Sequence, residues 1–138
     1  MKRTLFVAVL ALAAGILVGA LGTQILNAQQ PPFKRTMLLK TDMKGLEGKE
    51  GIVVLVEVAP GASLGKHYHN GHEFHYILEG SGVFEREGTA PVTVNPGATN
   101  HIPAEQVHDA KNTSATDPLK LLVFYVVEKG QPLAVPVK

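Results

Sequence analysis

The sequence of 138 residues contains no cysteine. Without cysteine the chain has no disulfide bond, no thiolate nucleophile and no acylated cysteine of the lipoprotein kind. If the protein acts outside the cytoplasm, its stability therefore has to come from the packing of its core and from any metal that it binds.

The sequence also lacks a concentration of charge of one sign. Its formal net charge is +1, and without Lys2 and Arg3, 11 basic residues stand against 12 acidic ones. The other lysines and arginines are scattered singly, with no basic stripe and no interleaved aromatic side chains. Binding to a nucleic-acid backbone requires such a stripe, so we expect no nucleic-acid partner.

Long amphipathic helices are missing as well, because after residue 33 no helical periodicity exceeds about two turns. Instead, 14 glycines and 9 prolines divide a chain that is 45% hydrophobic into short apolar runs. Such runs between turn residues are typical of β-strands. We predict strands at residues 35–40, 52–58, 74–78, 82–87, 91–95 and 119–127, with hairpin turns at 80–82 and 88–91. The expected fold is all-β, a sandwich or barrel in a single domain of about 110 residues.

The one long apolar run lies at the N-terminus. Lys2 and Arg3 precede residues 5–21, which are uncharged and rich in Ala, Gly and Leu. A basic stretch before an apolar run is typical of a bacterial export signal, and small residues suited to cleavage occur at 20–22 and at Ala28. An uncleaved membrane anchor is the alternative, because about 17 apolar residues approach the length that spans the hydrocarbon. Both interpretations place the domain outside the cytoplasm, periplasmic or secreted, with membrane contact only through this segment.

These features divide the chain into four parts. Residues 1–28 form the signal peptide or anchor, and residues 29–34, which include two glutamines and two prolines, form a linker. Residues 35–130 form the β-barrel domain, and residues 131–138 are expected to be a C-terminal tail.

All six histidines lie within residues 67–108, and Glu73 lies among them. His67 and His69 are two residues apart, so on a strand their side chains leave the same face and two imidazoles can converge on one ion. Glu73 can add a carboxylate oxygen, and His108 can complete the set from a separate segment. Three imidazoles and one carboxylate suit one divalent transition metal ion (Fe, Mn, Ni, Cu, Co or Zn) better than calcium or magnesium. The alternative is a group of surface or hydrogen-bonded histidines beside a solvated glutamate.

Two stretches have a spacing of glycine, histidine and glutamate that is known from other proteins. The first is Gly61-x5-His67-x-His69-x3-Glu73-x6-Gly80, and the second is Gly97-x5-Pro103-x-Glu105-x2-His108-x3-Asn112. They resemble the two conserved motifs of the cupin superfamily, with one departure at Glu105, where the family usually has glycine. The resemblance, to small single-domain bacterial cupins of the quercetin dioxygenase-like type, implies a jelly-roll β-barrel. It also implies His67, His69, Glu73 and His108 as metal ligands, with one coordination position open toward the barrel mouth.

Several residues near the motifs allow two interpretations. His75 shares strand parity with Glu73, so both are candidates for moving a proton, although His75 could equally be a barrel histidine bonded to a backbone carbonyl. Glu105 is expected in a solvent-facing turn, where a non-glycine residue costs on the order of 1 kcal/mol, rather than beside the metal.

Other positions are expected to be structural. The three motif glycines are expected to adopt positive φ in turns. His72 is expected in an exposed turn at residues 70–72, and Asp109 at the surface, on the face opposite His108. Most of the aromatic side chains are expected in the core, although they could line a pocket for an aromatic substrate; they are Phe74, Tyr76, Phe84, Phe124 and Tyr125.

The expected function is that of an exported metal-binding protein, most plausibly a metal-dependent enzyme of dioxygenase type that acts on a small organic molecule. A non-catalytic module that captures a small ligand or a metal is the alternative, and an isomerase or a hydrolase would use the same metal ligands. A purely structural metal fits less well, because the cupin ligand set leaves one position free and structural sites are usually closed. A homodimer through the apolar strand at residues 119–127 is expected by resemblance.

Overall fold

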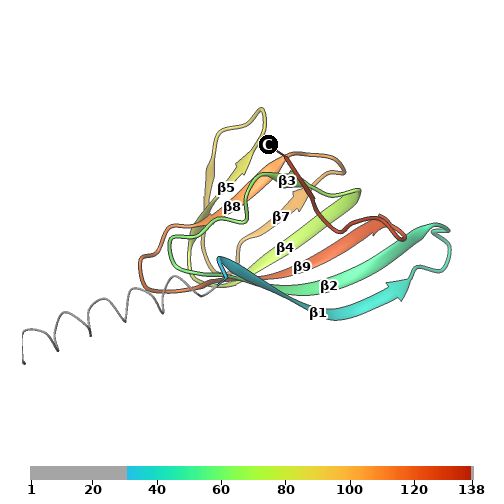
Figure 1. The fold of residues 1–138 in the computed structure, drawn as a ribbon, viewed down its shortest axis with the longest axis horizontal. Coiled ribbons are helices and arrows are strands. Elements are labelled where there is room, and N and C mark those ends of the chain that lie inside the picture. The colour runs from blue at the N-terminus through green and yellow to red at the C-terminus, as the bar shows by residue number, and fades with distance from the viewer. Residues whose placement is uncertain (1–30, 138) are drawn as a thin grey trace, which may run out of the picture. The chain divides into compact units, whose positions relative to one another are not determined.

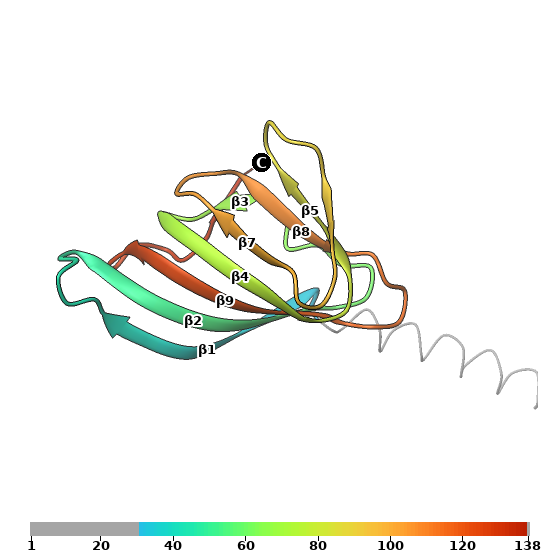
Figure 2. The same ribbon diagram turned by 180° about the vertical axis from the view of Figure 1, so that it is seen from behind.

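The computed structural model describes residues 31–137, which form two antiparallel five-stranded sheets around one core (Figure 1). The strands are β1 (Phe33–Asp42), β2 (Lys49–Val58), β3 (His67–Tyr68), β4 (Gly71–Glu79), β5 (Gly82–Arg86), β6 (Val92–Val94), β7 (Thr99–Ile102), β8 (His108–Asn112), β9 (Leu119–Glu128) and β10 (Val135–Pro136). The first sheet has the order β1-β2-β9-β4-β7, and the second has the order β10-β3-β8-β5-β6. The two layers are seen from the opposite side in Figure 2. The all-β prediction is confirmed.

Alternation of side chains along β2, β4 and β9 creates the core. In β9, Leu119, Leu121 and Val123 are buried, while the residues between them point away from the core. The same period-two pattern holds in β4, which brings Glu73 and His75 inside together with Ile77. Each fully buried aliphatic side chain contributes about 1.5–3 kcal/mol to folding. The polar interior positions of β4 are therefore held in place by a surrounding apolar core.

The predicted turn at residues 88–91 joins β5 and β6 as a hairpin, but the predicted hairpin at residues 80–82 is wrong. β4 pairs with β7 and β9, whereas β5 pairs with β6 and β8, so this turn carries the chain from one sheet to the other. Gly80 has φ of 74°, and a Cβ atom there would lie 2.3 Å from the carbonyl oxygen of Pro118. A tight glycine turn between two apolar runs looks the same in sequence whether the two strands pair with each other or lie in different sheets.

The expected turn at residues 70–72 is also wrong, because β4 already begins at Gly71. A Cβ atom on Gly71 would lie 2.2 Å from the carbonyl oxygen of Val126, so only glycine allows the backbones of β4 and β9 to approach this closely. His72 is exposed as expected, but it lies on a strand. This close approach fixes the start of β4 two residues before Glu73.

The folded domain is wider than residues 35–130. β1 begins at Phe33, and β10 pairs with β3, so two residues of the expected C-terminal tail, Val135 and Pro136, belong to the second sheet. Leu133 packs against the core as well. The predicted signal or anchor at residues 1–28 lies outside the described residues. Within residues 31–137, no helix is long and apolar enough to cross a bilayer.

Candidate metal centre

Both sheets contribute to the histidine cluster. His67 in β3 and His108 in β8 are cross-strand partners in the second sheet, and His69 directly follows β3. Glu73 projects into the same space from β4 of the first sheet. All four side chains are buried. The structure therefore brings together the four residues that the sequence predicted as ligands.

The three histidines of this cluster are oriented in the same way. In each of them, Nδ1 is hydrogen-bonded to a backbone carbonyl. The acceptors are the oxygens of Gly65 for His67 (2.7 Å), Leu133 for His69 and Gln106 for His108 (2.8 Å). A carbonyl can only accept, so each Nδ1 carries the proton and each Nε2 keeps its lone pair. This is the arrangement by which proteins orient metal-binding imidazoles.

The distances fit one ion. One ligand atom from each of His67, His69 and His108 lies within 4.8 Å of the other two. The Nε2 atom of His69 is buried and makes no hydrogen bond with any described residue, which is costly unless it binds something else. Neutral imidazole nitrogens suit zinc, copper, iron and nickel. The three-histidine cluster could therefore bind a transition metal ion.

Glu73 adds a negative charge to the cluster. Its Oε2 atom lies 2.8 Å from Nε2 of His69 and 3.5 Å from Nε2 of His108, while Oε1 accepts a hydrogen bond of 2.9 Å from Nδ1 of His75. Ligands held about 2.0–2.2 Å from one ion are themselves about 3 Å apart, so Oε2 is within reach of an ion bound to the histidines. The role of Glu73 as the fourth ligand stays a prediction.

The protonation states suit a cation. Burial lowers the pKa of His67 to about 4, so this imidazole is neutral at neutral pH. Burial alone would raise the pKa of Glu73, but the imidazoles of His108, His69 and His75 hold it well below its usual range. Burial would likewise lower the pKa of His108, but the Glu73 carboxylate raises it. A neutral His67 and an ionised Glu73 are the forms that bind metal.

Asp109 is connected to the site through hydrogen bonds to the loop before β3, and the prediction that it lies at the surface is wrong. It is buried, and its carboxylate accepts hydrogen bonds of 2.9 and 2.7 Å from the Ser63 hydroxyl. Ser63 in turn accepts a hydrogen bond of 2.9 Å from the N–H of Gly65, whose carbonyl orients His67. The loop that precedes β3 covers this side of β8, which strand parity alone could not reveal.

His75 is buried on the same side of β4 as Glu73, as predicted. Its ring stacks on Phe84 with 4.4 Å between centroids, and its Nε2 atom is buried without a hydrogen-bond partner within residues 31–137. The expected alternative of a backbone carbonyl partner is wrong, because its Nδ1 contacts the Glu73 carboxylate instead. The structure places His75 to position Glu73, and its role in proton transfer stays a prediction.

A small cavity of about 10 Å³ lies beside the ligands, with room for about one water molecule. Tyr125 lines this cavity, and its ring centroid lies 4.8 Å from that of His69. Burial and the Glu73 carboxylate raise the pKa of Tyr125 well above its usual value, so the hydroxyl keeps its proton. Arg35 lines the cavity too, and no motif in the sequence pointed to it.

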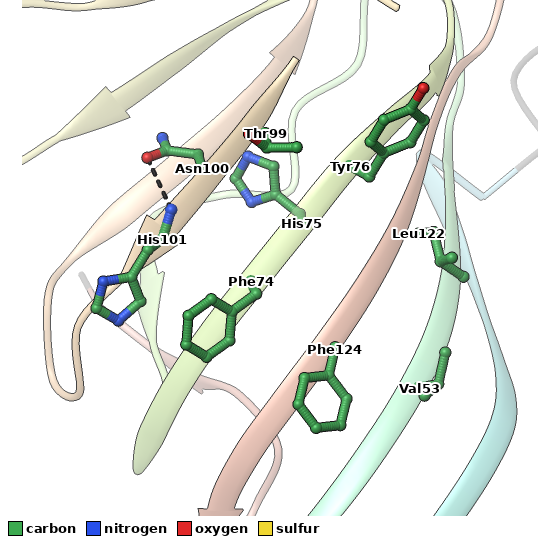
Figure 3. Close-up of a pocket in the computed structure, with 9 residues that line it drawn as sticks. All are labelled: Val53, Phe74, His75, Tyr76, Thr99, Asn100, His101, Leu122 and Phe124. Atoms are coloured by element: carbon green, nitrogen blue, oxygen red, sulfur yellow. Dashed lines mark hydrogen bonds between the residues drawn. The ribbon is translucent and has the colours of Figure 1, made fainter. Parts of the chain in front are cut away.

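Of the five aromatic side chains considered in the sequence, two lie at this site and three lie away from it. Phe84 and Tyr125 are buried as expected, but the prediction is wrong for Phe74, Tyr76 and Phe124, which are exposed. They occupy the outward positions of β4 and β9, where they help to line an open depression with a volume of about 790 Å³. Figure 3 shows them with the other lining residues. The Phe74 ring stacks on His101 with 4.7 Å between centroids. Alternation in the sequence separates the two faces of a strand. When both faces are apolar, it does not show which one is buried.

Glu105 adopts φ of 63° in the exposed loop before β8, as expected for a position that favours glycine. Its N–H donates a hydrogen bond of 2.9 Å to the carbonyl of His69. Its backbone thus holds the segment that carries His69. The motif glycines Gly61, Gly80 and Gly97 also have positive φ, which confirms the prediction.

Replacing His108 with alanine should remove one ligand and lower metal affinity sharply. A ligand present at about 100 times its Kd stabilises a protein by about 2.7 kcal/mol, so chelation should destabilise the wild type by about that amount and the variant by much less. Metal content by elemental analysis and unfolding with and without chelator measure both effects. The matched control is His101→Ala on the outer face. Equal metal content in the two variants would argue against the cluster as the binding site.

Comparison with known proteins agrees with this architecture. A family model described as "Cupin domain" matches residues 54–125. No protein with a curated description matches the sequence. Similar solved structures include a cupin superfamily protein from Desulfitobacterium hafniense, with 17% identity, a TM-score of 0.60, and coverage of 72% of this chain and 82% of that one.

Several similar structures are enzymes by name, among them the following two. The DMSP lyase DddQ from Ruegeria pomeroyi has 21% identity and a TM-score of 0.63 over 77% of this chain and 52% of that chain, so our chain matches about half its length. The polyketide cyclase RemF from Streptomyces resistomycificus has 21% identity and a TM-score of 0.60 over 80% and 78%. These identities show a common fold alone, and the quercetin dioxygenase-like type stays a prediction. The family match shows that this chain belongs to the cupin family, and the described residues form a jelly-roll barrel of that type.

Proposed function

We propose that this protein is an exported, metal-dependent enzyme that acts on a small organic molecule, with one divalent transition metal ion held by His67, His69, Glu73 and His108. The observation that carries the proposal is that three buried imidazoles have their Nδ1 atoms engaged by carbonyls, so that their Nε2 atoms remain for an ion. A cavity lies beside them. A bound ion would supply Lewis acidity and a position for oxygen or substrate.

The reaction that we propose is of dioxygenase type. Histidines with one carboxylate and an open position are the ligand set of many non-haem oxygenases. Glu73 and His75 would move the proton, because His75 Nδ1 and Glu73 Oε1 are 2.9 Å apart in a buried pair next to the cluster. When Glu73 binds through Oε2, Oε1 remains in contact with His75. The remaining lining is mostly apolar and would limit access of water to the reacting atoms.

A metal-dependent isomerase is a second candidate, because the same residues can move a proton without oxygen. The named lyase and cyclase among the structural neighbours support this candidate, since neither name implies an oxidation. A non-catalytic binding module is a third candidate, and the small size of the cavity favours one that captures only a metal, because about 10 Å³ leaves little room for an organic molecule without movement of side chains.

Reconstitution with iron, manganese, nickel or copper should produce a protein that consumes oxygen with catechols, flavonols or diketones, followed with an oxygen electrode. The His108→Ala variant should lose this activity, and His75→Phe should lower it while leaving metal content unchanged. Conversion of substrate without oxygen uptake would favour the isomerase. Metal-loaded protein that binds these compounds and leaves them unchanged would contradict an enzymatic role.

The export proposal rests on residues 1–28, with the basic start and apolar run described above. Fusion of residues 1–34 to a reporter enzyme that is active only outside the cytoplasm should give activity in a bacterial host, whereas a fusion without residues 1–28 should not. Mass spectrometry of the mature protein then separates a cleaved signal from a retained anchor. Full-length protein found in the cytoplasmic fraction would count against export.

We further propose that the outer face of the first sheet binds a second copy of this chain. One row of residues in register crosses all five strands without a charged side chain: Leu39, Val53, Phe124, Phe74 and His101. The neighbouring row is uncharged too: Thr36, Leu55, Leu122, Tyr76 and Thr99. Five strands that each cover about 4.8 Å and two rows that each cover about 7 Å give an area of about 340 Å². That area reaches the size at which exposed apolar patches mark interaction sites, and is about half of one side of a standard interface.

The charges around this face suit pairing with itself. Ion pairs flank it on both sides, Lys120 with Glu79 at 2.8 Å and Lys49 with Glu128. A two-fold axis through the aromatic centre can bring the lysines of one copy near the glutamates of the other, which is how a self-complementary dimer is built.

Substitution of Phe124 by glutamate should convert a dimer into a monomer in sedimentation velocity of the purified protein. Val92→Glu is the matched control, because Val92 is also exposed but lies on β6 of the second sheet. Circular dichroism checks that both variants are folded. A wild-type monomer at high concentration would contradict the proposed dimer, and a dimer that survives Phe124→Glu would place the interface elsewhere.

A further inference from the structure

Arg35 faces the metal centre from the edge of the first sheet. It is the cross-strand partner of Val56 in β2, and paired residues project from the same face of a sheet. Val56 is 2% exposed and belongs to the core, so Arg35 projects over the interior of the barrel. Arg35 lines the small cavity together with His67, Glu73 and His108. Because β1 is an edge strand, its side chain is also open to solvent.

The guanidinium of Arg35 is charged but has no carboxylate partner. Six lysines of the described domain form ion pairs: Lys34, Lys40, Lys49, Lys111, Lys120 and Lys129. Within residues 31–137, no carboxylate lies within 4.0 Å of the Arg35 guanidinium. Its Cζ atom instead lies 4.5 Å from the centre of the Phe33 ring, a cation–π contact that holds the side chain without neutralising it.

The side chains that line this cavity determine which kind of ligand can bind there. Besides the metal ligands, Arg35 and Tyr125, the lining is apolar: Val56, Leu64, Phe84, Ala110, Leu121 and Val123. Arg35 therefore supplies the permanent positive charge of the lining, and the Tyr125 hydroxyl supplies a neutral donor. An anion that enters can bind the ion at one end and the guanidinium at the other. A planar carboxylate matches the two parallel N–H groups of arginine.

We propose that the ligand of this site is a small organic acid, with its carboxylate bound by Arg35 and a neighbouring oxygen on the metal ion. The inference rests on the proposed metal centre and names its substrate class. The cavity holds about one water molecule, so only the oxygens next to the metal can lie inside it. The carboxylate then lies at the solvent-exposed edge, where the side chain of Arg35 can move to receive it. Arg35 is thus a residue that selects anionic substrates.

The test uses the full chain loaded with cobalt(II), whose visible spectrum reports both metal binding and ligands that reach the metal. Pyruvate is the probe, and pyruvamide is its neutral counterpart of nearly the same shape. Pyruvate should change the cobalt spectrum, and pyruvamide should do so only at much higher concentration. Arg35→Gln should weaken pyruvate binding about 10-fold to 100-fold, since charge-assisted hydrogen bonds are lost, while binding of pyruvamide should change little.

Two further variants keep the result interpretable. Arg35→Lys retains the charge without the planar fork and should show an intermediate affinity for pyruvate. Lys34→Gln is the matched control, because it also removes a positive charge from β1, but Lys34 pairs with Glu57 and does not line this cavity; this variant should bind pyruvate as the wild type does.

Equal affinities of the wild type and Arg35→Gln, equal binding of pyruvamide and pyruvate, or no spectral response to pyruvate would each overturn the role of Arg35 while leaving the metal site intact. A protein that fails to bind cobalt would contradict the metal centre itself, and this inference with it.

Discussion

The candidate metal centre depends on three hydrogen bonds from imidazole Nδ1 atoms to backbone carbonyls. The carbonyls belong to Gly65, Leu133 and Gln106, which lie in three separate loops, so each histidine is oriented by a different part of the chain. Because these acceptors are backbone atoms, their positions follow from the fold. Close backbone contacts of residues that are not ligands themselves, such as Gly71 against Val126, therefore contribute to the geometry of the site.

The charged side chains of the site can be buried only because they lie next to one another. Glu73 is surrounded by His69, His75 and His108, and an isolated carboxylate at this depth would be strongly disfavoured. A divalent cation among neutral imidazoles and one carboxylate balances that charge. The edge strand β1, at the far side of the first sheet from β7, adds a second charge to this interior, because Arg35 is a permanent cation that faces it. One charged cluster thus links metal binding, the orientation of Glu73 and the selection of an anionic ligand.

The sequence predicted the parts of this structure that depend on local spacing. Alternation placed Glu73 and His75 on one face, and the two motifs brought His67, His69 and His108 to a common site. Features that depend on contacts between distant segments were missed: the burial of Asp109 under Ser63, the pairing of β10 with β3, and the crossing between sheets at Gly80. Phe74 and Phe124 were assigned to the core but are exposed. Both faces of β4 and β9 carry apolar side chains, so the sequence alone could not tell which face the second sheet covers.

The central claim is that one ion is bound by the Nε2 atoms of His67, His69 and His108 together with Glu73. A crystal structure of the metal-loaded protein, with anomalous scattering recorded at the absorption edge of the metal, tests it most directly. The account predicts one anomalous peak at about 2.0–2.2 Å from the three Nε2 atoms and from one carboxylate oxygen of Glu73. A peak at the exposed pair His72 and His101, or coordination through Nδ1 in place of Nε2, would contradict it.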